Sequence, residues 1–178
     1  MIRRWQHVAL PVLLGLTART DLLAQELSAR PPETVLFVCE HGTVKSLLAK
    51  VLFEQYAADA GLRMRALSRG TRADSLVPEW MQKGLHADHV ELGTWHPQTL
   101  RPADLRNAAF VVSFDVLRSF TAGAHARQTS WDGLPSVSAD YANGRDAIKL
   151  RVRALVDSLV RVQKARKPRG RRGQSGFR

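Results

Sequence analysis

The sequence predicts an α/β fold with a parallel sheet, because buried strands and amphipathic helices alternate along the chain. Residues 35–38, Val-Leu-Phe-Val, form a continuous apolar run between a proline pair and a glycine, which is typical of a strand buried on both faces. Residues 108–114 form a second apolar run. From Ile148 to Leu159 the apolar residues recur at spacings of one, three and four, which predicts an amphipathic C-terminal helix.

Four further segments complete this alternation. Apolar residues at helical spacings predict a largely buried helix over 46–58, which Gly61 ends. Over 62–66 apolar residues alternate with arginines, so this segment is expected to be a strand near the sheet edge. A helix is expected over residues 75–86. Residues 136–139 are expected to form the last strand, followed by a loop and the C-terminal helix.

Length and composition indicate one globular domain. The chain has 178 residues, with 44% hydrophobic and 24% charged residues, which excludes collagen-like, wholly disordered and multi-span membrane proteins. Its single cysteine, Cys39, excludes an internal disulfide framework and a four-cysteine metal site. His86 and His89 have no third ligand at a suitable spacing, so neither a metal site nor a cofactor is expected.

The formal net charge of +11 is concentrated near the C-terminus. Residues 161–178 hold eight basic residues and no acidic one. We expect residues 163–178 to form a disordered basic tail, because their glycines, proline and charges cannot build a core. A solvated tail without a nucleic acid partner is the simpler interpretation. The alternative is a tail that binds nucleic acid, an anionic lipid or an acidic partner.

The N-terminal residues have the layout of a secretory signal. A basic start precedes the apolar run 8–16 and a polar stretch with small residues. The run is shorter than the about 20 apolar residues that span a bilayer. We therefore expect a signal peptide over 1–24, a linker over 25–33 and export to the periplasm or the exterior. Cleavage after Ala18 or Ala24 would place Leu16 or Leu22 where a signal peptide usually has a small residue, so the alternative is an uncleaved extension on a cytoplasmic protein.

The residue types that carry chemistry follow the first predicted strand, in the segment Cys39-Glu40-His41-Gly42-Thr43-Val44-Lys45-Ser46. Beyond the carboxyl end of a parallel strand, the next helix presents free N–H groups and the positive end of its dipole. The loop has the right length to curl its amides around a tetrahedral oxyanion, and Gly42 permits backbone angles that other residues resist. The helix amides, the Ser46 hydroxyl and the Lys45 cation favour a Cys39 thiolate, which predicts a nucleophile. The alternative for Cys39 is a small buried hydrophobe.

This segment resembles the loop of the low-molecular-weight protein tyrosine phosphatases and of the arsenate reductases that share their fold. The family loop is a strand ending in cysteine, five further residues, and Arg-Ser at the start of a helix. Cys39 and Ser46 match this pattern, and Lys45 stands in the arginine position. The resemblance implies a three-layer sandwich with a four-stranded parallel sheet and a phosphate-binding loop after the first strand.

Other segments extend the resemblance to about residues 34–162. Residues 68–71, Ser-Arg-Gly-Thr, resemble the family's Ser-Ala-Gly-Thr turn, and residues 109–114 resemble its third strand. Residues 131–141 resemble the region that carries its general acid. The resemblance implies that phosphate is bound by Glu40, His41, Gly42, Thr43, Val44 and Lys45, mostly through their backbone amides.

The resemblance also implies a two-step hydrolysis. Cys39 would attack phosphorus and form a phosphocysteine, Lys45 would hold phosphate oxygens, and Ser46 would stabilise the departing thiolate. Asp140 is the expected general acid, although the family has proline where Tyr141 follows it, and Asp132 is the rival. The alternative for either aspartate is a turn or helix cap.

Two departures from the family pattern keep other functions open. Lys45 keeps the positive charge of arginine but loses its bidentate grip on phosphate. His41 is adjacent to Gly42, which replaces the family's usual asparagine, and is a candidate oxyanion donor, loop brace or packing residue. The main prediction is therefore a cysteine-dependent phosphomonoesterase acting on a phosphorylated substrate. The alternatives are an arsenate reductase coupled to an external thiol, a non-catalytic module that binds a small oxyanion, and a phosphocysteine carrier.

Overall fold

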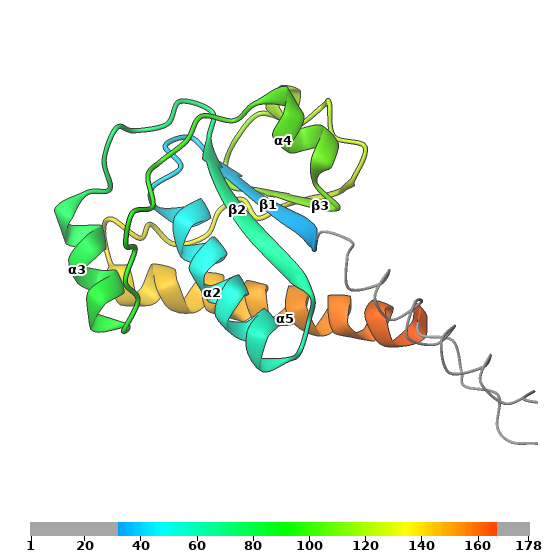
Figure 1. Ribbon diagram of the computed structural model, residues 1–178. Helices are drawn as coiled ribbons and strands as arrows, with labels where there is room; N and C mark the ends of the chain where they lie inside the picture. Colours follow the sequence, from blue (N-terminus) through cyan, green and yellow to red (C-terminus); the bar gives the residue numbers. More distant parts are fainter. Residues whose placement is uncertain (1–31, 167–178) are drawn as a thin grey trace, which may run out of the picture. The chain divides into compact units, whose positions relative to one another are not determined.

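The computed structural model describes residues 32–166. Strands and helices alternate through most of this part of the chain, as Figure 1 shows. Their order is β1 (Glu33–Cys39), α2 (Lys45–Asp59), β2 (Met64–Gly70), α3 (Glu79–Ala87), α4 (Pro102–Asn107), β3 (Phe110–Ser113), the 3-10 helix η1 (Arg118–Phe120), β4 (Arg127–Ser130) and α5 (Tyr141–Arg166).

The four strands form one parallel sheet in the order β2-β1-β3-β4. The predicted α/β fold with a four-stranded parallel sheet is confirmed. Because all strands run the same way, their carboxyl ends share one edge of the sheet, and Cys39 is the last residue of the central strand β1. The segments that follow β1, β2 and β3 therefore converge around this cysteine.

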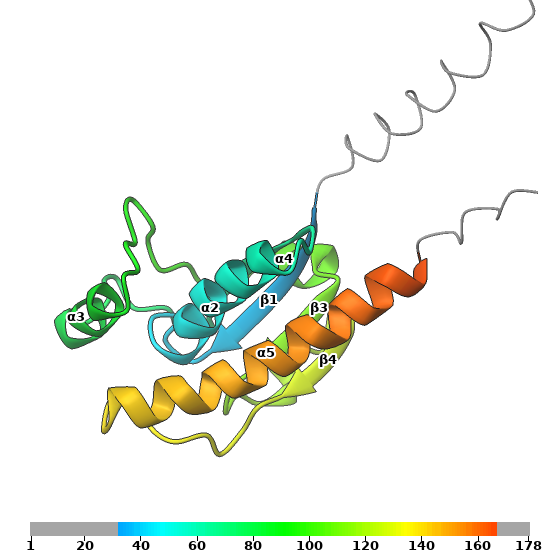
Figure 2. The same cartoon turned by 90° about the horizontal axis from the view of Figure 1, so that it is seen from below.

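The sheet is the middle of three layers. Helices α2 and α5 pack side by side on one face and α4 covers the other (Figures 1 and 2). Residues 35–38 are fully buried, with Val35 and Phe37 in the core beneath α2 and α5, and Leu36 and Val38 in a smaller cluster with Leu105 of α4. This alternation explains the continuous apolar run, since both faces of the strand are covered.

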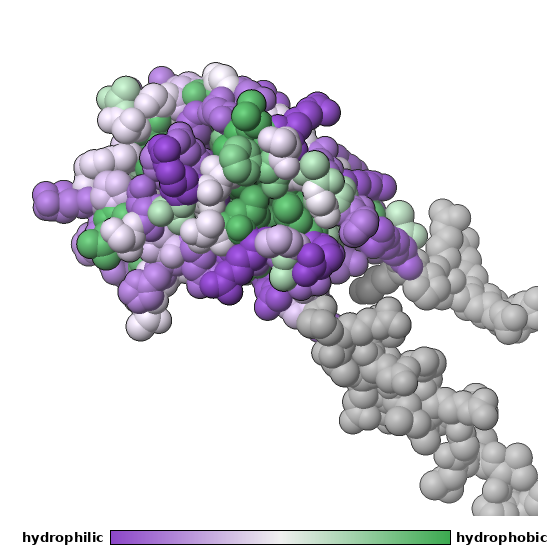
Figure 3. All heavy atoms as spheres, turned by 90° about the horizontal axis from the view of Figure 1, so that it is seen from above, coloured by the Kyte–Doolittle hydropathy of each residue, from purple (hydrophilic) through white to green (hydrophobic). Residues whose placement is uncertain are grey.

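Helix α4 is held on the sheet by a shielded ion pair. Arg69 of β2 donates to both carboxylate oxygens of Asp104, at 2.9 and 3.2 Å, and both side chains are largely buried. The face that carries α4 has apolar residues gathered near its middle (Figure 3). The segment after β3 belongs to this side, because Val116 and Ala124 pack against the smaller cluster.

The prediction of a last strand at residues 136–139 is wrong. These residues form a turn before α5, and the fourth strand is β4, whose sequence Arg-Gln-Thr-Ser is polar. An edge strand with mostly exposed side chains has no apolar run, so hydrophobic patterning does not reveal it. Val137 is nevertheless buried, and its backbone lies so close to Gly144 that a Cβ there would come within 2.7 Å.

Two helix boundaries also differ from the prediction. Helix α3 begins at Glu79 and not at residue 75. Pro78 precedes the helix, and a proline disfavours helical backbone angles at the residue before it. Helix α5 continues to Arg166, past the predicted domain end at 162. Gln163 donates to the Gly61 carbonyl at 3.4 Å and Arg166 pairs with Glu33 at 3.8 Å, so these residues belong to the folded domain.

The predicted signal peptide over 1–24, most of the linker over 25–33 and tail residues 167–178 lie outside the described residues. Within residues 32–166, no helix is long and apolar enough to cross a membrane.

Phe37 is a fully buried side chain of the main core that contacts three other aromatic rings. Its ring contacts Phe53, Phe114 and Trp131 at centroid distances of 5.9, 6.4 and 6.1 Å. We predict that Phe37→Ala lowers the free energy of unfolding by about 3–5 kcal/mol, measured by urea denaturation. Leu150→Ala, at a position 70% exposed on α5, should change it by less than about 0.5 kcal/mol. Equal effects of the two changes would contradict this account of the core.

Candidate functional site at the carboxyl edge of the sheet

The loop of residues 39–46 joins β1 to α2, and hydrogen bonds gather around its cysteine sulfur. The Gly42 amide donates to Cys39 Sγ at 3.2 Å, and Ser46 Oγ lies 2.9 Å from the same sulfur. Ser68 of β2 places its hydroxyl 2.8 Å from Ser46 Oγ and 2.9 Å from the Gly42 carbonyl. When Ser68 donates to Ser46, the Ser46 proton is left for the sulfur, which is the arrangement that stabilises a thiolate.

The start of α2 adds to this environment. The helix begins at Lys45, its preceding residue Val44 supplies no side-chain cap, and its first turn holds no acidic residue. The first amides of a helix have no partner inside the helix and carry partial positive charge. The N-terminal end of α2 is therefore suited to binding an anion.

The curl of the loop requires glycine at two positions. Gly42 has φ +75, and a Cβ there would lie 2.7 Å from the Gly70 amide nitrogen. A Cβ on Gly70 would lie 2.7 Å from Ala73 Cα and 2.8 Å from the His41 carbonyl carbon. The two backbones thus pass each other at a distance that admits no side chain.

The chain after β2 holds the loop through its backbone. The amides of Thr71, Arg72 and Asp74 donate to the carbonyls of Cys39, Glu40 and His41 at 3.0, 2.8 and 3.0 Å. With these loop carbonyls bonded to the chain after β2, the curl is fixed before any ligand arrives.

Asp74 is a part of the site that the sequence did not reveal. Its carboxylate accepts from Thr43 Oγ1 at 2.8 Å and lies 3.0 Å from His41 Nδ1. His41 is thus held as a brace of the loop, which was one of its expected roles. Glu40 lies at the rim, where its half-exposed carboxylate pairs with Arg72 at 2.6 Å.

Lys45 points to the loops that follow β3 and β4. Its Nζ donates to Asp115 Oδ2 at 2.6 Å and to the Leu134 carbonyl at 3.3 Å. Asp115 also accepts from the Gly133 amide at 2.9 Å, and its own amide donates to Asp132 Oδ1 at 2.8 Å. Asp115 therefore ties three loops together.

The protonation of Asp115 follows from these contacts. Partial burial by itself would raise the pKa of Asp115, but the hydrogen bonds from Lys45 and Gly133 and the charge of Lys45 outweigh it. The pKa of Asp115 is consequently lowered below its usual value, so the side chain is ionised at neutral pH. The position of Asp115, two residues after β3, was a signal that sequence reasoning overlooked.

The two candidate acids occupy different places. Asp140 precedes α5 and its Oδ1 accepts from the Asn143 amide at 3.0 Å, as a helix cap does. Tyr141 fixes this end of the helix: its hydroxyl donates to Asp88 at 2.8 Å and its ring packs against Gly84. Burial, followed by the bond to Asp88, raises the pKa of Tyr141 far above its usual value. Asp132 is committed to the Asp115 amide.

A cavity of about 400 Å³ opens beside the loop. It is lined by Glu40, by Thr71 and Arg72 after β2, and by the segment after β3. Leu117 and Phe120 line it with apolar side chains that are 72% and 46% exposed. Among residues 32–166, no cluster of three or more His, Cys, Asp or Glu is arranged to hold a metal ion.

Structural comparison finds the same fold in several solved proteins. YfkJ from Bacillus subtilis superposes with a TM-score of 0.66 at 19% identity, covering 78% of this chain and 99% of that one. YwlE arginine phosphatase from Geobacillus stearothermophilus gives 0.64 at 18% identity, covering 76% and 97%. A thioredoxin-dependent arsenate reductase from Corynebacterium glutamicum gives 0.58 at 23% identity, covering 83% and 72%. No curated protein matches by sequence.

The family assignment comes from the sequence itself. Residues 34–130 match the family model described as low molecular weight phosphotyrosine protein phosphatase. This range spans more than half of the chain and includes the whole loop from Cys39 to Ser46. It agrees with the expected resemblance and with the prediction of a cysteine-dependent phosphatase. The chain belongs to the low molecular weight phosphotyrosine protein phosphatase family.

Proposed function

We propose that this chain hydrolyses phosphate monoesters in two steps through a phosphocysteine at Cys39. The proposal rests on the position of the Cys39 sulfur. Cys39 is the last residue of the central strand β1, and its Sγ lies at the start of α2, within hydrogen-bond distance of the Gly42 amide and the Ser46 hydroxyl. A thiolate in this position is a nucleophile next to amides that bind a tetrahedral oxyanion.

In the first step, the Cys39 thiolate attacks phosphorus and the bond to the leaving oxygen breaks. Asp140, protonated, gives its proton to that oxygen, so the alcohol or phenol departs neutral. In the second step, Asp140 takes a proton from water, the oxygen of that water attacks phosphorus, and the sulfur departs as thiolate. The Ser46 hydroxyl donates to the departing sulfur, and its 2.9 Å separation from Cys39 supports this role.

Asp140 is the proposed acid because Asp132 links the loop after β4 to the loop after β3, through the bond from the Asp115 amide. Each carboxylate accepts one backbone amide through Oδ1, so Asp140 keeps Oδ2 for proton transfer. The bond from Tyr141 to Asp88 keeps the start of α5 in place.

Lys45 gives this site a weaker hold on phosphate than the family's arginine would give. An ammonium group has three donors, and Lys45 uses two of them on Asp115 and the Leu134 carbonyl. One donor is left for a phosphate oxygen. A guanidinium has five donors, enough to keep an ion pair with Asp115 and still grip two phosphate oxygens. The amides of the loop and of α2 therefore carry most of the binding.

This proposal predicts how substitutions change the turnover of p-nitrophenyl phosphate by the full chain. Cys39→Ser should abolish it, and Asp140→Asn should lower kcat by about 10²–10⁴-fold because the leaving group loses its acid. Asp132→Asn should leave kcat within about threefold, since that carboxylate acts only on the loop. Lys45→Arg should raise kcat/KM by about tenfold through a bidentate contact.

The opposite pattern is equally informative. A folded wild type and a folded Lys45→Arg variant that both fail to release nitrophenol would refute the phosphatase proposal. Arsenate reduction with added glutathione would then support the external-thiol reductase, because Cys39 is the only cysteine of the chain. Binding of phosphate without either reaction would support the non-catalytic module.

The ion pair between Lys45 and Asp115 also predicts how stability depends on pH. The folded-state pKa of Asp115 lies below the usual 3.8, so its stabilising contribution is complete above pH 3.8 and disappears as the pH falls through the lower folded value. The difference in Tm between wild type and Asp115→Asn should therefore be constant from pH 7 to 5 and shrink below about pH 4. Glu79→Gln, which breaks an exposed pair with Lys83, should change Tm little at any pH. A difference that grows in acid would contradict this role for Asp115.

A further inference from the structure

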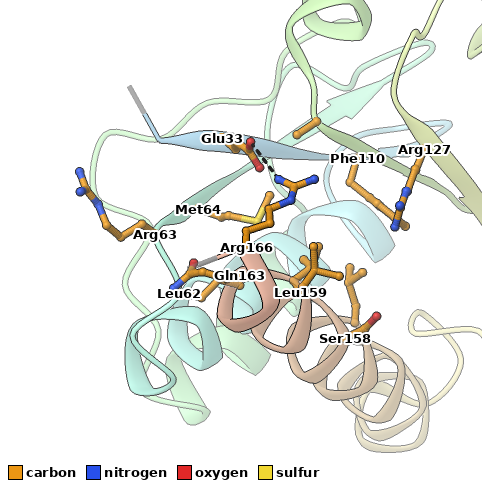
Figure 4. A pocket seen from close by; sticks show the side chains of 13 residues that line it. Glu33, Leu62, Arg63, Met64, Phe110, Arg127, Ser158, Leu159, Gln163 and Arg166 are labelled. Atoms are coloured by element: carbon orange, nitrogen blue, oxygen red, sulfur yellow. Dashed lines mark ion pairs between the residues drawn. The ribbon is translucent and has the colours of Figure 1, made fainter. Parts of the chain in front are cut away.

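A second cavity lies at the end of the sheet opposite to Cys39. It has a volume of about 360 Å³ and is bordered by the starts of all four strands and by the last turns of α5. Figure 4 shows Met64 and Phe110 approaching it from the sheet and Leu159 from the helix. None of these side chains takes part in the site around Cys39.

The floor of this cavity is apolar. Met64, Phe110 and Leu159 are half-buried and pack on the main core. Leu62 and Leu155 are buried and also line the cavity. A ligand without an apolar part would make no favourable contact with this apolar surface. The floor therefore favours a ligand that has a hydrocarbon body.

The rim of the cavity carries positive charge. Among its lining residues, Glu33 is the one acid, whereas Arg63, Arg127 and Arg166 are basic. Arg127 is exposed at the start of β4, and no ion pair within residues 32–166 involves it. Arg166 pairs with Glu33 across 3.8 Å, and both side chains are more than half exposed, so the pair contributes little and its guanidinium is open to a further anion.

We propose that this cavity binds an amphipathic anion, with a single acyl chain on the floor and an anionic head between Arg127 and Arg166. An apolar body with a few placed charges at its edge is the pattern of small-molecule sites, and 360 Å³ lies at the lower end of their size range. The charge of the rim excludes a cationic head and disfavours a neutral one. The ligand is either a free fatty-acid-like molecule or the chain of a bilayer lipid.

This site is independent of the phosphatase reaction. Glu33 and Cys39 are the two ends of β1, which at about 3.3 Å per residue places them about 20 Å apart. The head of a bound amphiphile therefore reaches none of the loop amides. Failure of either proposal leaves the other standing.

The test is calorimetric titration of the full chain with laurate below its micelle concentration. We expect one site, with binding about tenfold weaker in Arg127→Gln and at least tenfold weaker in Leu159→Gln. Leu150→Gln, at an exposed position of the same helix, should bind laurate like the wild type. The neutral amphiphile decyl maltoside should bind at least tenfold more weakly. Melting curves establish that each variant is folded.

Two further arms identify the source of the ligand. Cosedimentation with phosphatidylglycerol vesicles that is weakened by Arg127→Gln would assign the site to a bilayer lipid. Vesicle binding that is unchanged by this variant, together with weakened laurate binding, would assign it to a free amphiphile. Laurate binding that is the same in the wild type, Arg127→Gln and Leu159→Gln would overturn the proposal, as would equal affinity for decyl maltoside.

Discussion

The contact between Gly42 and Gly70 is the constraint on which the site depends. Both residues lack a Cβ, and the space between them admits none. The chain after β2 therefore runs close enough to hold the carbonyls of the loop by backbone hydrogen bonds. That contact also brings Ser68 to Ser46 and Asp74 to the loop side chains. The thiol environment is thus a consequence of two backbones in contact, and any larger residue at either glycine would displace all of these groups together.

A second constraint joins the loop to the far side of the site. Asp115 bonds to Lys45 and to the backbone of residues 132–133, so the position of the lysine and the loops after β3 and β4 are coupled. A flexible point charge fits this arrangement, because it satisfies a carboxylate and a carbonyl at once. The replacement of arginine by lysine therefore alters the connection between loops as well as the hold on phosphate.

The parts of the fold that rest on burial were predictable, whereas the parts that rest on long-range polar contacts were not. The apolar run of β1 and the periodicity of α2 and α5 predicted that these elements contribute side chains to the core. The polar edge strand β4 left no pattern, so its place was assigned to residues 136–139. Cys39, Gly42 and Ser46 were found because they are neighbours in sequence. Asp74 and Asp115 lie 31 and 70 residues from the loop residues that they contact, and only the sheet topology brings them there.

The parallel sheet also separates two kinds of anion recognition. At the carboxyl edge, anions meet backbone amides and a helix start, which favour a compact group with several hydrogen-bond acceptors, such as phosphate. At the amino edge the strands begin among Met64, Phe110 and Leu159, and the positive charge comes from arginine side chains above that apolar surface. Such a surface lowers the free energy of an anion only when a hydrocarbon is buried with it. The two ends of one sheet therefore select ligands of the same charge by different criteria, hydrogen bonding to backbone amides at one end and burial of a hydrocarbon at the other.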